Sequence, residues 1–331
     1  MPAPPGPLDW PSPRRLKASL PGTLKEGAKF RQIQRFRRAH PVAGNLMSMS
    51  NDGGEVVAGF VNGEEKWRAG LGSLRQVVRQ ELVARQLAAH VPDVPARRVL
   101  DIGCGQGTQA LSLARRGHFV TGLDPSARLL DDFRAATESE PAEVGTRVRL
   151  VHGDSSAISG LFGPSSFDVV LCQGVLMYLP DPGPLLDAIA QVAVPGGIVS
   201  LLVRNGDALA MRPGLLGDWH NVDRAFEGET YLNRIGVRAR GDRLDDLASA
   251  LAQRQMPVAS WYGVRVFTDT AASDAPLPDE ATLDAIVHAE ERAGQTDPYR
   301  HVAALLHLIA VRSEIAVRSE IALRSDEASP S

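Results

Sequence analysis

The stretch from Val99 to Ser126 reads VLDIGCGQGTQALSLARRGHFVTGLDPS and constrains the fold more than any other part of the chain. An apolar run ending in Asp101 leads into three glycines at alternate positions, a helical pattern that stops at Gly117, and a second apolar run ending in Asp124. This order predicts a strand, a glycine-rich turn, a helix and a second strand. Glycine lets such a turn adopt positive φ and approach a ligand closely. The turn is therefore expected to form the floor of a cofactor site.

Spacing and charge in this stretch indicate which cofactor binds. The dinucleotide fingerprint G-x-G-x-x-G places a pyrophosphate at a helix N-terminus, whereas this turn reads G-x-G-x-G from Gly103 to Gly107. Asp101, two residues before the first glycine, would repel a phosphate but suits an ammonium group. Asp124 closes the second strand and is placed to accept hydrogen bonds from both ribose hydroxyls. An amino-acid ammonium and an adenosine ribose together describe S-adenosylmethionine.

At these residues the chain resembles the class I S-adenosylmethionine-dependent methyltransferases. Asp154 and Ser155 follow the third predicted strand, where an acid and a hydroxyl can bind adenine, and Gln173 follows the fourth, at the ligand edge of the sheet. In the family a helix before the first strand often covers the cofactor, so Arg75 is expected to reach the methionine carboxylate. No metal is expected. The predicted cofactor-binding residues are Arg75, Asp101, Gly103, Gly105, Gln106, Gly107, Asp124, Asp154, Ser155 and Gln173.

The remaining sequence alternates helical and extended patterns. It predicts helices over 74–90, 126–137, 180–192, 243–255 and 279–293, and strands over 148–152, 167–171, 198–204, 258–269 and 305–311. The expected fold class is α/β, a doubly wound, mostly parallel, seven-stranded Rossmann-like sheet with a cap segment after strand five. The expected domains are a proline-rich, basic and disordered extension over 1–50, a methyltransferase domain over 51–312 with its cap at about 205–241, and a mobile tail over 313–331.

Charge and composition bear on which partners and which compartment are expected. The 331 residues carry a formal net charge of −3, so total charge does not favour nucleic acid. Cys104 and Cys172 show no metal-ligand spacing and are expected to be small core residues in a reducing compartment. No run is long enough to span a membrane and the start lacks a signal-peptide core, so a cytoplasmic location is expected.

Four further segments resemble one branch of the family, the bacterial tRNA 5-carboxymethoxyuridine carboxyl methyltransferases. They are GSLRQVV around Arg75, SLLVRNGDALAMRPGLLGD at 200–218, GVRVFTD at 263–269 and TDPYRHVAALLHLIAVR at 296–312. The resemblance covers about residues 65–312 and implies esterification of a modified wobble uridine in tRNA. Two departures lie on the substrate side: Gln173 stands where relatives place a histidine, and the lysine-rich part of the relatives' cap is absent.

Two alternatives stay open. The acidic balance and the missing lysines favour a small-molecule O- or N-methyltransferase, and an intact cofactor motif also fits a non-catalytic S-adenosylmethionine-binding protein. His152 and His220 are the conspicuous histidines; His152 is expected to be structural, and His220 in the cap is the candidate general base. A carboxylate acceptor needs no base because it is already ionised at neutral pH.

Overall fold

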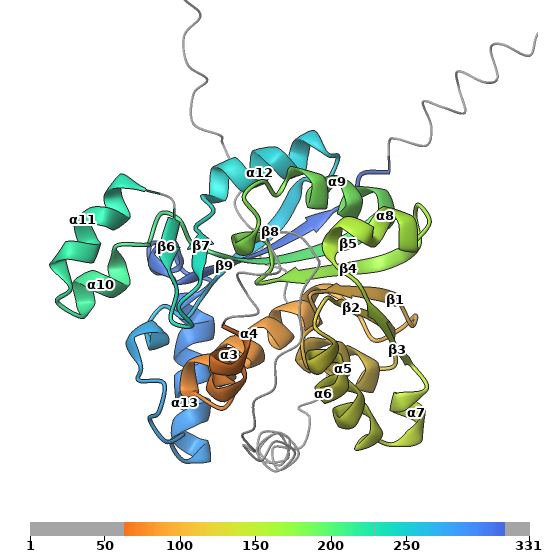
Figure 1. Ribbon diagram of the computed structural model, residues 1–331, viewed down its shortest axis with the longest axis horizontal. Coiled ribbons are helices and arrows are strands. Elements are labelled where there is room, and N and C mark those ends of the chain that lie inside the picture. Colours follow the sequence, from red (N-terminus) through yellow and green to blue (C-terminus); the bar gives the residue numbers. More distant parts are fainter. Residues whose placement is uncertain (1–62, 229, 315–331) are drawn as a thin grey trace, which may run out of the picture. The chain divides into compact units, whose positions relative to one another are not determined.

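A seven-stranded sheet is the centre of the part of the chain that the computed structural model describes, residues 63–228 and 230–314 (Figure 1). Its strand order is β3-β2-β1-β4-β5-β9-β8. The strands are β1 (Arg98–Ile102), β2 (Phe119–Asp124), β3 (Val148–His152), β4 (Phe167–Gln173), β5 (Ala193–Arg204), β8 (Val258–Val264) and β9 (Leu305–Val311).

Strands β1 to β5 pair in parallel, and β9 lies antiparallel between β5 and β8. The predicted doubly wound, mostly parallel sheet is thereby confirmed. Chain order reverses between β1 and β4, so the helices after these strands lie on opposite faces of the sheet. A crevice opens at such a switch point, beyond the carboxyl ends of the strands.

Helices cover both faces of the sheet (Figure 1). One face carries α4 (Leu74–His90), α5 (Thr108–Arg115), α6 (Ala127–Glu138) and α13 (Glu280–Ala293), and the other carries α8 (Ile158–Leu161), α9 (Gly183–Val192) and α12 (Leu244–Gln253). Shorter pieces are α3 (Glu64–Gly70), α7 (Ala142–Gly145), α10 (Met211–Leu215), α11 (Trp219–Glu227), and the 3-10 turns η1 (Ser155–Ala157), η2 (Leu176–Tyr178), η3 (Thr268–Thr270) and η4 (Tyr299–Val302).

Burial follows the periodicity of the sequence. Helix α4 has the predicted bounds and turns Val77, Val78, Leu82, Val83 and Leu87 into the core. On the other face, side chains of α8, α9 and α12 pack against β1, β4, β5 and β9 in one apolar cluster. Cys104 and Cys172 are free and buried, as predicted.

Two sequence predictions about local structure are wrong. The strand expected over 258–269 ends at Val264, because Arg265 adopts φ +63° and Glu290 binds the backbone N–H groups that follow. The cap, over which the sequence predicts no helix or strand, contains α10, α11 and a hairpin of β6 (Thr230–Leu232) and β7 (Arg238–Arg240). These pieces escape prediction because they are short, and no residue of α11 is buried.

The extension over 1–50 and nearly all of the tail over 313–331 lie outside the described residues. Within 63–228 and 230–314, no helix combines the length and the apolar character needed to cross a bilayer.

Candidate functional site

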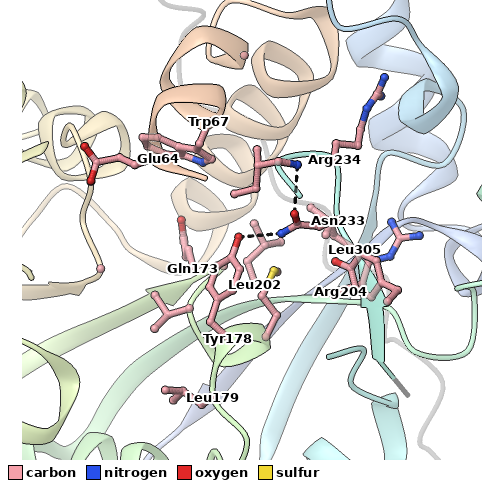
Figure 2. Close-up of a pocket in the computed structure, with 18 of the residues that line it drawn as sticks. Glu64, Trp67, Gln173, Tyr178, Leu179, Leu202, Arg204, Asn233, Arg234 and Leu305 are labelled. Atoms are coloured by element: carbon pink, nitrogen blue, oxygen red, sulfur yellow. Dashed lines mark hydrogen bonds between the residues drawn. The ribbon is translucent and has the colours of Figure 1, made fainter. Parts of the chain in front are cut away.

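A cavity of about 1830 Å³ opens at the carboxyl edge of the sheet (Figure 2). In this view Gln173 and Tyr178 lie below Glu64 and Trp67, and Arg204 lies to their right. Ligand pockets usually measure about 300–1,000 Å³, so this one has room for a cofactor and for part of a second molecule. Lining residues that follow the strands are Gly103 and Gly105 after β1, Asp124 and Pro125 after β2, Gly153, Asp154 and Ser155 after β3, and Gly174 after β4.

The glycine turn has two faces. Gly103 and Gly105 line the cavity with φ of +66° and +55°. Gly107 has φ +81° and faces the core, where an added Cβ would lie 2.3 Å from the Phe133 ring. An added Cβ would also meet a side chain at the first two glycines, Val175 at 2.4 Å from Gly103 and Trp67 at 3.0 Å from Gly105, so all three positions are closely packed.

Asp124 is held rigidly at the edge of the cavity. Its Oδ2 accepts a hydrogen bond from the Gly105 backbone N–H at 2.8 Å, and its Oδ1 accepts one from the Ser126 N–H at 2.8 Å. Burial raises the pKa of Asp124, while these two backbone N–H groups lower it. Carboxylate oxygens can each accept a further hydrogen bond. The geometry fits the ribose hydroxyls of S-adenosylmethionine.

Asp101 and Gln106 lie behind the turn and do not line the cavity. Burial and the neighbouring Asp124 raise the pKa of Asp101 to about 7, against an attraction to Arg79. The Gln106 amide donates to the Thr108 hydroxyl at 3.0 Å.

The predicted adenine and methyl-group residues line the cavity. Asp154 accepts hydrogen bonds from the Ser156 N–H and hydroxyl, at 2.8 and 2.6 Å, and these bonds lower its pKa. Ser155 begins η1 beside it. Gln173 donates its amide to the Ser200 hydroxyl at 3.0 Å, and Ser200 in turn contacts His307 at 2.8 Å. Gln173 is thus oriented from the core side of the sheet.

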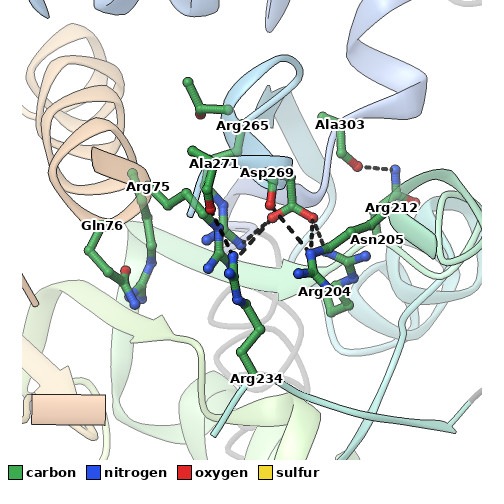
Figure 3. A network of polar contacts seen from close by, with 12 residues as sticks. Arg75, Gln76, Arg204, Asn205, Arg212, Arg234, Arg265, Asp269, Ala271 and Ala303 are labelled. Carbon is green, nitrogen blue, oxygen red and sulfur yellow. Dashed lines mark hydrogen bonds and ion pairs between the residues drawn. The ribbon is translucent and has the colours of Figure 1, made fainter. Parts of the chain in front are cut away.

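The opposite end of the cavity holds a group of arginines around one carboxylate, the Asp269 cluster (Figure 3). Asp269 Oδ1 lies 3.5 Å from Arg75 and 3.4 Å from Arg265. Its Oδ2 lies 3.3 Å from Arg204 and 3.9 Å from Arg212. In the described part of the chain, one acid thus faces four arginines, and Arg234 donates nearby to the Ala271 carbonyl at 3.1 Å.

The electrostatics of the Asp269 cluster favour an anion. Burial alone would raise the pKa of Asp269. The nearby guanidiniums outweigh burial and lower this pKa to about 2, with Arg265 contributing most, followed by Arg204 and Arg75. Burial and repulsion from Arg265 lower the pKa of Arg75 to about 9, so it stays charged at neutral pH. Among the described residues, the buried Nε atoms of Arg75, Arg204 and Arg265 have no hydrogen-bond partner. A second anion would satisfy these donors and reduce the repulsion.

Sequence reasoning found Arg75 but missed its arginine neighbours. The acids between Asn205 and Gly241 nearly cancel the basic residues when the segment is only counted. In space one of these acids, Asp207, faces Arg243 at 3.8 Å and does not line the cavity. Two segments singled out in the sequence carry these residues: 200–218 supplies Arg204 and Arg212, and GVRVFTD at 263–269 supplies Arg265 and Asp269.

The two candidate histidines have different settings. His152 lies at the end of β3 and contacts the Pro125 carbonyl at 2.9 Å, which agrees with its expected structural role. His220 lies on α11, exposed to solvent at the rim of the cavity. It is the one histidine among the described lining residues.

Comparisons with known proteins agree with this geometry. The family model described as a methyltransferase domain matches residues 100–201. The tRNA 5-carboxymethoxyuridine methyltransferase of Escherichia coli K12 is 27% identical over 239 residues, which cover 72% of this chain and 88% of that protein. The ubiquinone biosynthesis O-methyltransferase of Pectobacterium atrosepticum is 36% identical over 121 residues, which cover 37% of this chain and 48% of that protein.

A chain from the solved complex between the Haloferax volcanii Trm112 methyltransferase activator and a methyltransferase has the same fold. Its TM-score is 0.51 at 18% identity, and the match covers 80% of this chain and all of that one. The sheet order and this likeness show the class I methyltransferase fold, and the matching domain and the relatives show that the chain is an S-adenosylmethionine-dependent methyltransferase.

Proposed function

We propose that this methyltransferase esterifies a carboxylate, and that the acceptor is a carboxymethoxyuridine-type wobble base in tRNA. The observation that carries the proposal is the Asp269 cluster, which places four arginines against one acid in the cavity. An anionic acceptor suits this excess of positive charge, whereas a neutral or cationic one does not.

The cofactor end of the cavity is assigned residue by residue. Asp124 accepts the ribose hydroxyls, Asp154 and Ser155 bind the adenine, and Gly103 and Gly105 allow close approach of the backbone. Arg75 pairs with the methionine carboxylate from the near side of the Asp269 cluster. Gln173 lies between the two ends, and Asp101, Gln106 and Gly107 support the turn from behind.

Methyl transfer to a carboxylate requires no acid or base from the protein. S-adenosylmethionine supplies a methyl group on a sulfonium, so a carboxylate oxygen forms the new C–O bond while the S–C bonding pair leaves on a neutral thioether. No proton has to be removed from a carboxylate at neutral pH. The side chains need only align the acceptor and exclude water. The exposed His220 is accordingly not required as a base.

The share of each relative that this chain matches supports a tRNA acceptor over a metabolite. Its match reaches 88% of that protein, whereas the ubiquinone-pathway relative is matched over 48% of its length. The ubiquinone-pathway relative is nevertheless 36% identical over its matched part, against 27% for the tRNA-modifying relative, so small-molecule O-methylation is the second candidate.

The test uses tRNA isolated from a strain of the source organism that lacks this gene. Purified protein and S-adenosylmethionine are added, and the nucleosides are analysed by mass spectrometry for a new uridine methyl ester. The Asp124→Ala protein serves as the control for cofactor dependence. An unchanged set of wobble uridines would contradict the proposal, and methylation of an RNase-treated metabolite extract would favour the second candidate.

A further inference from the structure

The turn after β8 has an unusual backbone at Arg265. Strand β8 ends at Val264, and Arg265 adopts φ +63°, a left-handed conformation that side-chain-bearing residues rarely occupy. Such strain persists only where the surroundings impose it. Here the conformation places the Arg265 side chain on the cavity, four residues before Asp269.

Glu290 on α13 imposes this conformation. Its side chain is 0% exposed. The carboxylate accepts hydrogen bonds from three consecutive backbone N–H groups, those of Val266, Phe267 and Thr268, at 2.6, 3.0 and 2.7 Å, and from the Thr268 hydroxyl at 2.6 Å. One buried carboxylate therefore holds the whole turn between Arg265 and Asp269. It does so from a helix that contributes no lining residue within the described part of the chain.

Arg265 and Arg204 are the most deeply buried members of the Asp269 cluster. They are 6% and 7% exposed, and their unpartnered Nε atoms are buried. The Arg204 guanidinium also lies 5.4 Å from the centre of the Tyr231 ring, within cation–π range. Both guanidiniums are thus held in place with donors to spare, a pre-organised arrangement for a carboxylate.

We propose that Arg204 and Arg265 form the subsite for the acceptor carboxylate, and that Glu290 is the positioning residue of this subsite. The inference rests on the proposed function, because it supposes an anionic acceptor. Arg75, which approaches Asp269 from α4, is left for the cofactor carboxylate (Figure 3).

This subsite distinguishes substrate from product by charge. Before methyl transfer the acceptor carboxylate pairs with both guanidiniums, and afterwards the neutral ester keeps only weaker hydrogen bonds. Loss of the ion pair promotes product release and disfavours rebinding. The acid should therefore bind about 10- to 100-fold more tightly than the ester, as expected for hydrogen bonds to a charged group.

The experiment compares the intact protein with three variants. Arg265→Asn removes the charge but keeps a residue that tolerates positive φ. Glu290→Gln replaces one acceptor oxygen with a donor that opposes a backbone N–H. Glu291→Gln is the matched control, since Glu291 is the next residue on α13 and pairs with Arg85 at 3.0 Å, outside the cavity.

Five quantities are measured for each protein. They are the affinity for S-adenosylhomocysteine, the affinities for 5-carboxymethoxyuridine and for its methyl ester with S-adenosylhomocysteine bound, and kcat and KM on tRNA. Arg265→Asn and Glu290→Gln should weaken binding of the acid and raise the KM by about 10- to 100-fold, with the cofactor-product affinity changed less than about twofold. Glu291→Gln should match the wild type.

Each contrary result has one meaning. The subsite would be overturned if the wild type bound acid and ester with equal affinity, or if Arg265→Asn bound the acid as tightly as the wild type does. A folded Glu290→Gln protein that behaves like Glu291→Gln would overturn the role of Glu290. Arg265-dependent binding of the acid without esterification of tRNA would support the subsite while refuting the proposed function.

Discussion

Replacing Asp101 with Asn should change how stability depends on pH. Burial and the neighbouring Asp124 raise the pKa of Asp101 from 3.8 to about 7 in the folded protein. Between these values the folded state keeps a proton that the unfolded state has released. This contribution to stability is complete below the lower pKa and is lost as the pH rises through the upper one. At 1.36 kcal/mol for each pKa unit, the shift from 3.8 to about 7 corresponds to about 4 kcal/mol of unfolding free energy.

The assay is urea unfolding of the ligand-free protein, followed by tryptophan fluorescence at several pH values. Between about pH 5 and pH 8.5 the wild type should lose about 3 kcal/mol of unfolding free energy relative to Asp101→Asn. Asp187→Asn is the control, because Asp187 is exposed and pairs with Arg254 on the surface. A difference between wild type and Asp101→Asn that stays constant across this range would refute the reasoning.

Four further substitutions test cofactor binding, packing around glycines and the need for a general base. Asp124→Ala should weaken cofactor binding by about 1–3 kcal/mol in calorimetry, and unchanged affinity in a folded variant would place the ribose elsewhere. Gly107→Ala should lower unfolding free energy by about 3 kcal/mol or more, since the new Cβ would meet Phe133 at 2.3 Å. Gly117→Ala, also at positive φ but with open space around it, should cost only about 1 kcal/mol in the same denaturation. His220→Ala should keep kcat within about threefold of wild type on a carboxylate acceptor, whereas a loss of about 100-fold would indicate a general base.

Most of the fold could be predicted from the spacing of apolar residues along the chain. Helix α4 has the bounds expected from its apolar spacing, and the predicted order of strands and helices matches the sheet that forms. These features are visible in sequence because each depends on neighbours a few residues away. The strand expected to reach Asp269 failed for the opposite reason, since Glu290, more than twenty residues later, takes the backbone N–H groups of its last part.

The cofactor end of the site was also readable from local pattern. Asp124 and the first two glycines follow directly from a strand–turn–helix–strand order, and the structure places them together on the cavity. The same pattern did not separate Gly107, Asp101 and Gln106, which face the core, from the residues that face the ligand. Orientation within a turn depends on what packs behind it, here Phe133 of α6.

The sequence by itself determined the class of fold and the donor of the methyl group, because both are written in short-range spacing. Only the tertiary structure decided where charge accumulates. Arg75, Arg204, Arg212 and Arg265 come from four separate elements, and their meeting around Asp269 depends on how α4, β5, α10 and the turn after β8 pack. A count of charges along the chain averages to near zero, but a Coulomb interaction depends on distance in space. The acceptor site is therefore a property of the packing.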